Sequence, residues 1–119
     1  MSHCSGIIDR PEIYLSEYHY GKDSPMELGI FLESYLSKNG KYYSNKNFIS
    51  QKLGEEFLYS NIGSALAAYI VEIISGKPFN IFTKEIIFDN IKMPNTYWFL
   101  SNKKKTDLGL TRFPPVSQK

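Results

Sequence analysis

The sequence has almost no cysteine, little net charge and no long apolar run, and each shortage excludes a class of protein. Cys4 is the only cysteine, so no disulfide can form within the chain. The formal net charge is only +2, and the lysine run 103–105 reads as a solvated loop, so we expect no nucleic-acid partner. The longest apolar stretch, residues 62–74, contains Glu72 and falls short of the about 20 residues that span a bilayer, so no transmembrane segment is expected.

The first residues lack two further features. Residues 1–6 have no basic region followed by an apolar stretch, so no signal peptide is expected, and the sequence leaves localisation open. His3 and Cys4 have no second Cys–His cluster to join them, whereas a zinc site normally needs three or four protein ligands. We therefore expect no metal or other cofactor, and we interpret His3 as either a structural residue or part of a frayed terminus.

What is present indicates a folded domain. Apolar residues make up 42% and charged residues 22% of the chain, a balance typical of globular proteins rather than disordered ones. A length of 119 residues fits one domain. Nine tyrosines and eight phenylalanines indicate a large packing surface, or surface that expects a partner. Residues 101–119 are expected to form an irregular tail, since Pro114-Pro115 prevents a helix there.

Three helices are predicted, separated by long ordered loops. The first follows a capping box at Ser24–Glu27, with Pro25 at the first helical position, and ends at Asn39-Gly40. The second covers residues 62–74, with Ser60 or Asn61 as N-cap and Gly76 as the stop. Its apolar residues on nearly all sides predict burial, yet two further helices and loops are little cover for it, so we expect it to pack against more protein than this chain contains. The third opens at Pro78 and ends at Asp89-Asn90. Its predicted inward-facing residues are Phe79, Phe82, Ile86 and Ile87.

The triplet Tyr59-Ser60-Asn61 directly precedes the second helix. A hydroxyl that can exchange a proton and a carboxamide that can hold a substrate lie two residues apart at the helix entrance, which suits acyl-transfer chemistry. The plain alternative is a buried tyrosine next to a helix N-cap. Asp9, like Glu55 and Glu56, reads as a surface acid.

The order of several short motifs resembles the β-lactamase-related serine hydrolases, which include class C β-lactamases, penicillin-binding DD-peptidases and related esterases. The resemblance covers about His3 to Leu110. Its motifs, in order, are His3-x-Ser5-Gly6-Ile7, Phe57-Leu58-Tyr59-Ser60-Asn61-Ile62-Gly63, Ala67-x-Tyr69-Ile70-Val71-Glu72-x-Ile74-Ser75-Gly76, Ile87-Phe88 and Met93-x-Asn95-Thr96-x-Trp98.

The resemblance implies roles for two residues. The family uses three boxes: S-x-x-K with the nucleophilic serine, Y-x-N, and a third box of Lys or His, Ser or Thr, then Gly. Tyr59 would take part in proton transfer to and from the nucleophile and leaving group, and Asn61 would hydrogen-bond the acyl amide of the substrate. A phenol alone is a poor base at neutral pH, so the lysines of the other boxes would have to favour the phenolate.

Those other boxes have only imperfect counterparts. Ser101-Asn102-Lys103-Lys104 spells S-x-x-K, but it follows the Tyr box, which it should precede, and lacks an apolar helix to present the serine. Lys105-Thr106-Asp107 resembles the third box but ends in Asp, where glycine lets the substrate approach. We interpret both as chance matches.

The expected fold is therefore mainly α: the helical region of a β-lactamase/transpeptidase-like α/β fold, with the central sheet largely missing. Residues 1–119 are expected to form a single partial domain that is inactive alone, with the remainder of the hydrolase domain as its partner and a small acyl substrate in the parent enzyme. Two alternatives stay open: a non-catalytic helical module that binds a partner through its apolar face, and a partial gene product whose complement is another chain.

Overall fold

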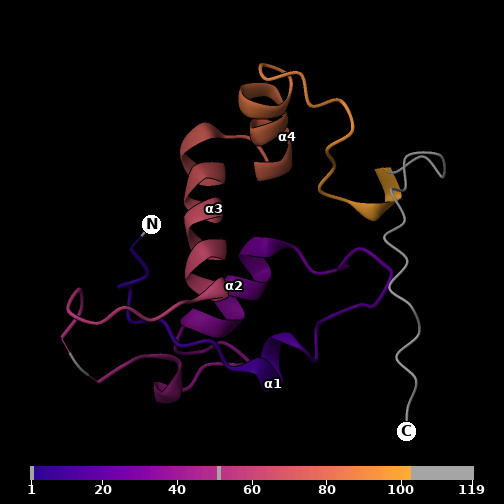
Figure 1. The fold of residues 1–119 in the computed structure, drawn as a ribbon. Helices are drawn as coiled ribbons and strands as arrows, with labels where there is room; N and C mark the ends of the chain where they lie inside the picture. Colours follow the sequence, from indigo (N-terminus) through magenta and orange to yellow (C-terminus); the bar gives the residue numbers. More distant parts are fainter. Residues whose placement is uncertain (1, 51, 103–119) are drawn as a thin grey trace, which may run out of the picture.

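The computed structural model describes residues 2–50 and 52–102. The long helix α3 (Asn61–Ser75) extends away from a base that is formed by the N-terminal half of the chain (Figure 1). Over the described residues there is no β-strand, only an isolated antiparallel bridge between Ile7 and Phe48. The predicted mainly α fold class is confirmed. The elements are, in order, α1 (Pro11–Tyr14), α2 (Leu28–Leu36), the 3-10 turn η1 (Asn45–Asn47), α3 (Asn61–Ser75), α4 (Phe79–Thr83), the π-helical turn η2 (Lys84–Phe88) and the 3-10 turn η3 (Leu100–Asn102).

Both ends of α3 lie where the sequence predicts them. Ser60 is the N-cap, and its hydroxyl accepts a hydrogen bond from the backbone N–H of Gly63 at 2.8 Å. At the other end Gly76 has a φ of 66°, in the left-handed region, and its N–H donates to the Glu72 carbonyl at 2.9 Å. The predicted N-cap and C-terminal stop are confirmed.

Within the described residues α3 is buried on only part of its surface, in line with the little cover that two further helices can give it. Ile62, in its first turn, is 3% exposed, but Ile73 and Ile74 in its last turn are 66% and 82% exposed. The reason is that α2 and α4 contact α3 on only part of its circumference. An apolar helix surface of this size is normally covered by other protein.

The predicted start of α2 is wrong. The hydroxyl of Ser24 accepts from the N–H of Met26 at 3.2 Å and not from Glu27, and it makes a local turn. Glu27 itself is the N-cap, with extended backbone angles of φ −68° and ψ 146°, and the helix begins at Leu28. Pro25 therefore lies in the turn before the helix and not at its first position.

The helix α2 ends at Leu36, before the predicted stop at Asn39-Gly40. Gly40 serves a different purpose: a Cβ at this position would lie 2.3 Å from the carbonyl oxygen of Ser34. The chain can thus fold back closely enough for the N–H of Tyr42 to donate to that same carbonyl at 2.9 Å. Gly40 is needed for close approach rather than for a left-handed cap.

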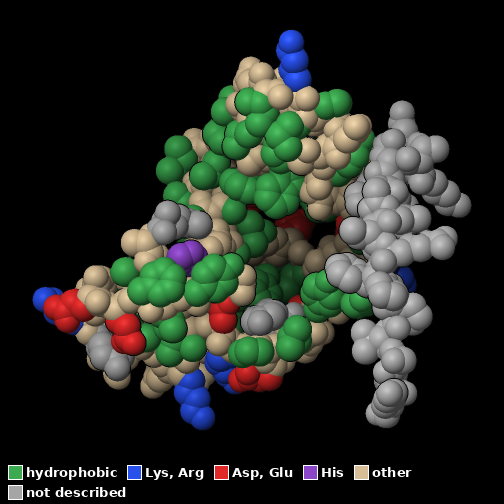
Figure 2. Space-filling view, viewed as in Figure 1, with side chains coloured by type: hydrophobic (Ala, Val, Ile, Leu, Met, Phe, Trp, Pro, Cys, Tyr) green, Lys and Arg blue, Asp and Glu red, His purple; other side chains and the backbone are tan. Residues whose placement is uncertain are grey.

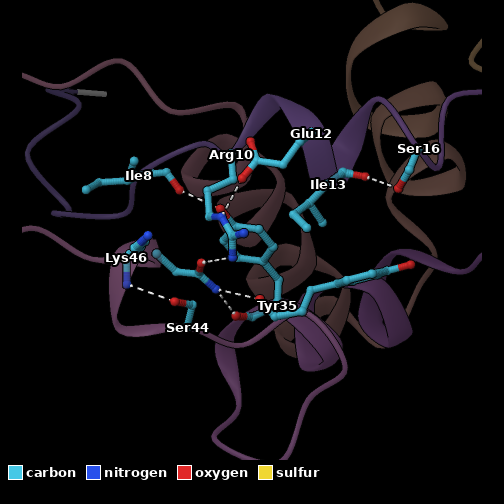
Figure 3. Close-up of polar contacts among 10 residues, drawn as sticks. Ile8, Arg10, Glu12, Ile13, Ser16, Tyr35, Ser44 and Lys46 are labelled. Carbon is cyan, nitrogen blue, oxygen red and sulfur yellow. Dashed lines mark hydrogen bonds and ion pairs between the residues drawn. The ribbon is translucent and has the colours of Figure 1, made fainter.

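Asn47 holds η1 against α2 and is fully buried. Its Nδ2 donates to the carbonyls of Tyr35 at 2.8 Å and Tyr42 at 3.0 Å, and its Oδ1 accepts from Arg10 Nη1 at 3.3 Å. The Tyr35 hydroxyl donates to the Ile8 carbonyl at 2.7 Å (Figure 3), and burial raises the pKa of the Tyr35 phenol. This network ties the first ten residues to α2, beside a small apolar core. The buried apolar residues are Ile7, Leu32, Tyr35 and Ile62.

The third predicted helix begins as α4 and widens into η2. Thr83 is buried where the two meet, and its hydroxyl oxygen accepts from Trp98 Nε1 at 2.7 Å. The Trp98 ring packs edge-on against Phe79, with 5.3 Å between ring centroids. Beyond Thr83 the π-helical pitch changes the rotation per residue, so Ile86 and Ile87 are exposed and their predicted inward orientation is wrong.

Two irregular segments contain short helical turns. Residues 5–23 form an irregular segment that includes the single turn α1. The predicted tail 101–119 lies outside the described residues apart from its first two, which belong to η3.

In the described part of the chain no single helix is both long and apolar enough to cross a membrane. By length and composition only α3 and Phe79–Phe88 together reach that threshold, across a bend of 83°.

Candidate functional site

The candidate site is built at the N-terminus of α3, around a buried serine. Ser60 is 1% exposed, and its hydroxyl is used twice for structure: it donates to Asp9 Oδ1 at 2.7 Å and accepts from the N–H of Gly63. Because Ser60 is fixed, the residues on either side of it are held at the surface. This serine therefore anchors the triplet and has no free hydroxyl for catalysis.

Asp9 fixes the same helix end and is not a free surface acid, which corrects the interpretation from the sequence. One of its carboxylate oxygens accepts from the N–H of Asn61 at 2.7 Å, and the other accepts from the N–H of Ile62 at 3.1 Å as well as from the Ser60 hydroxyl. A negative charge at a helix N-terminus is favoured by the helix dipole, and these amides have no partner within the helix. Asp9 is thus a positioning residue for the triplet.

The sequence offered no signal for this role. Asp9 lies in an irregular segment, 51 residues before Ser60, and no motif read from the residues alone links the two. Only the fold brings them together.

Tyr59 and Asn61 point to one shared, solvent-facing edge. The Tyr59 hydroxyl donates to Asn61 Oδ1 at 3.2 Å, and both side chains are exposed, Tyr59 by 59%. The plain alternative of a buried tyrosine beside an asparagine N-cap is wrong, since the N-cap is Ser60. The pair offers, side by side, a hydroxyl for proton exchange and a carboxamide for hydrogen bonding.

An aromatic wall backs this edge. The His3 ring packs against the Tyr59 ring with centroids 4.6 Å apart, and it meets Phe57 edge-on at 5.7 Å. His3 Nδ1 also accepts from the backbone N–H of Ser60 at 3.4 Å. The structural role expected for His3 is thus to support the triplet.

The described residues bring no second catalytic box to this edge. Ser101 lies in η3, where its backbone N–H donates to Asp23 at 3.0 Å, and Lys104 and the segment 105–107 lie outside the described residues. None of the ion pairs or cation–π contacts of the described chain involves Tyr59. Nor do residues 2–50 and 52–102 contain a group of three or more His, Cys, Asp or Glu able to hold a metal ion.

A large apolar groove lies elsewhere on the molecule. It has a volume of about 1590 Å³ and is lined by residues of α2, α3 and α4, with Trp98 and Phe99 at its edge; Tyr59 and Asn61 are not among its lining residues. Figure 2 shows a hollow between the upper helical arm and the base, with hydrophobic side chains gathered around it. The hydroxyl–carboxamide edge and the groove are therefore separate features.

Comparison with known proteins identifies the family. The family model described as Beta-lactamase matches residues 34–111, which is 78 of the 119 residues and includes Tyr59 and Asn61. No curated protein and no solved structure matches the chain. The described residues fit the helical region of the β-lactamase fold, and no counterpart of its sheet is found among them. The chain belongs to the β-lactamase family and is, on that basis, a portion of a β-lactamase-related hydrolase.

Proposed function

We propose that Tyr59 and Asn61 belong to the active site of a serine hydrolase that cleaves an amide or an ester by acyl transfer. The substrate class is a β-lactam, a peptidoglycan peptide or a small ester, as in β-lactamases and penicillin-binding proteins. Tyr59 exchanges a proton with the nucleophile and the leaving group. Asn61 hydrogen-bonds the acyl amide of the substrate.

The observation that carries this proposal is the hydrogen bond between the two exposed side chains. Because the Tyr59 hydroxyl donates to Asn61 Oδ1, the Asn61 Nδ2 hydrogens are left to donate to a substrate carbonyl. The same bond leaves the phenol oxygen facing solvent as an acceptor. A nucleophile placed within about 3 Å of that oxygen would have a proton acceptor and a substrate anchor side by side.

The nucleophile and the activating cation come, in this proposal, from another part of the hydrolase. Tyr59 needs a nearby ammonium to act as a base at neutral pH, and no ion pair or cation–π contact of the described residues involves it. Catalytic residues that act as a unit contribute little separately. We therefore infer that this chain alone does not turn over substrate and that its partner is the remainder of the hydrolase domain.

A second candidate function is a non-catalytic helical module. The observation that favours it is the apolar groove between α2, α3 and α4, together with the exposed isoleucines of α3. DNA upstream of the reading frame distinguishes the two. An in-frame segment encoding S-x-x-K favours the hydrolase, and intergenic sequence together with a stable monomeric chain favours the binding module.

The test joins this chain to segments supplying S-x-x-K and the third box, and follows hydrolysis of nitrocefin and a p-nitrophenyl ester. Tyr59→Phe is expected to lower kcat by roughly 10² to 10⁴-fold, the usual contribution of a proton-transfer group. Asn61→Ala is expected to lower kcat/KM for the amide more than for the ester. The matched control is Tyr43→Phe, a tyrosine of the 41–58 loop. Equal activity of the Tyr59→Phe and unchanged proteins would overturn the proposal.

A further inference from the structure

The apolar groove has a marked imbalance of charge along its lining. Four glutamates and a single basic residue, Lys77, contribute to it. Lys77 is already paired with Glu85, so it does not offset the acids. The four lining glutamates are Glu17, Glu27, Glu33 and Glu72.

Three of these acids, Glu27, Glu33 and Glu72, take part in none of the ion pairs of the described chain. Glu17 accepts from the Tyr42 hydroxyl and forms an ion pair with Lys41 Nζ at 3.9 Å, and Glu72 accepts from the backbone N–H of Phe79 at 2.6 Å. Glu27 and Glu33 lie at the beginning and on the exposed side of α2. The groove therefore combines an apolar floor with an acidic rim in which Glu27 and Glu33 have no ionic partner among the described residues.

The chain leaves its described part at the edge of this groove. Trp98 and Phe99 line the groove. The next two residues are anchored, because the Asp23 carboxylate accepts the N–H of Leu100 at 2.6 Å and that of Ser101 at 3.0 Å. Asp23 directly precedes Ser24, which is itself a lining residue. Residue 103 thus follows from a point fixed beside the α2 side of the groove.

The segment that begins there has the complementary composition. It opens with three consecutive lysines and carries five basic residues against one acid, Asp107. Its four large apolar residues are Leu108, Leu110, Phe113 and Val116. Its positive charges complement the acidic rim of the groove, and its apolar side chains match the apolar floor.

We propose that residues 103–119 bind along the α2–α3–α4 groove of their own chain, with the lysines 103–105 at Glu27 and Glu33 and the apolar residues on the floor. The segment has 17 residues and reaches about 55 Å when extended, whereas the 15-residue helix α3 is about 22 Å long. The segment is therefore long enough to extend along the groove. This inference uses neither Tyr59 nor Asn61, so it stands apart from the proposed function.

The first test is zero-length carbodiimide cross-linking of the full chain, with the linked peptides identified by mass spectrometry. Links from lysines 103–105 to Glu27 and Glu33 are expected to be several-fold more abundant than links to Glu56, an exposed acid of the 41–58 loop. Mixing ¹⁴N- and ¹⁵N-labelled chains separates links within one chain from links between chains. Equal yields at all three glutamates, or links only between chains, would overturn the proposal; the latter would assign the groove to a second copy.

The second test uses Trp98, the only tryptophan, as a reporter at the groove edge. Replacing lysines 103–105 by glutamate in the full chain is expected to raise the acrylamide quenching constant of Trp98 about twofold. Raising the salt concentration to 1 M should act on the unchanged chain in the same direction. Lys46→Glu, which alters charge in η1, is the control and should change neither the quenching constant of Trp98 nor its response to salt. Unchanged quenching in the triple variant would contradict the proposal.

Discussion

Asp9 lies 51 residues before Ser60 in the chain, and its carboxylate accepts a hydrogen bond from the Ser60 hydroxyl. It also accepts from the backbone N–H groups of Asn61 and Ile62 at the start of α3. A sequence motif consists of the residues inside each box, such as Tyr59 and Asn61, and of the spacing between boxes. The geometry of Tyr59 and Asn61 also depends on a carboxylate that stands outside the box. At the scale of single residues, the family resemblance singled out Tyr59 and Asn61 but gave no sign of the carboxylate that holds them in place.

Asp9→Asn tests this support. The asparagine amide keeps one acceptor oxygen but has no charge, and its NH₂ group faces N–H and O–H donors with which it cannot form a hydrogen bond. We therefore expect the stability of this helix end to fall by roughly 1–2 kcal/mol. Hydrogen exchange measures the effect locally: the amides of Asn61 and Ile62 should exchange about tenfold faster or more. Asp89→Asn, at an exposed ion pair with Lys84, is the control and should leave both amides unchanged. Unaltered exchange in Asp9→Asn would show that the carboxylate does not hold the triplet.

At the scale of elements, the ends of α3 could be predicted and those of α2 could not. Capping at Ser60 and Gly76 is local, because each capping hydrogen bond joins residues that are at most four positions apart in the chain. The Ser24 hydroxyl lies near two amides, those of Met26 and Glu27, and the sequence pattern alone does not show that it accepts from Met26. The π-helical turn after Thr83 breaks the 3.6-residue period on which the assignment of inward faces relied.

Gly76 provides a sharp test of the C-terminal cap of α3. With φ at 66°, Gly76→Ala places a Cβ in the left-handed region and should destabilise the helix end by roughly 1 kcal/mol. Gly76→Asn should cost about half as much or less, because asparagine tolerates this conformation. Urea unfolding of the two variants against the unchanged chain gives the comparison. Equal costs for Ala and Asn would mean that side-chain contacts, and not backbone conformation, set the preference.

The contact between Asp23 and η3 predicts a dependence on pH. Hydrogen bonds from the N–H groups of Ser101 and Leu100 hold the pKa of the Asp23 carboxyl below its usual range. A carboxyl whose folded pKa is lowered stabilises the fold at pH values above the unfolded pKa, about 3.9, and this stabilisation is lost as the pH falls through the folded pKa.

Acidification should therefore release η3 below about pH 4 and shift the emission of Trp98, two residues before Leu100. Asp23→Asn cannot form the charged contact, so its emission at pH 7 should already resemble that of the unchanged chain in acid. The measurement is the Trp98 emission maximum from pH 7 to pH 2 for both proteins. Superimposable curves would refute the contact.

At the scale of the whole molecule, the described chain has more apolar surface than it buries. Four apolar side chains are buried, and the last turn of α3 and η2 are open to solvent. The sequence pattern showed that α3 is suited to burial on nearly all sides, but a pattern cannot say what covers a face. The predicted sheet region and the predicted partner concern protein that the described residues do not contain.

This distribution predicts a strong contrast between two isoleucines of α3. Ile62→Ala removes a side chain that is 3% exposed and should cost roughly 2–4 kcal/mol, whereas Ile74→Ala, at 82% exposed, should change stability by less than about 0.5 kcal/mol. Chemical unfolding followed by circular dichroism measures both. Equal destabilisation by the two substitutions would contradict the described packing.

The central proposal is that the exposed phenol of Tyr59 and carboxamide of Asn61 serve a serine supplied by another part of the hydrolase. Mass spectrometry of the purified chain after incubation with a fluorescent penicillin and with p-nitrophenyl acetate tests this most directly. We predict that every serine stays unmodified with the chain alone, and that one equivalent of acyl group appears on the S-x-x-K serine once the remaining segments are joined. An acyl adduct on a serine of this chain alone, lost in Ser101→Ala, would contradict it.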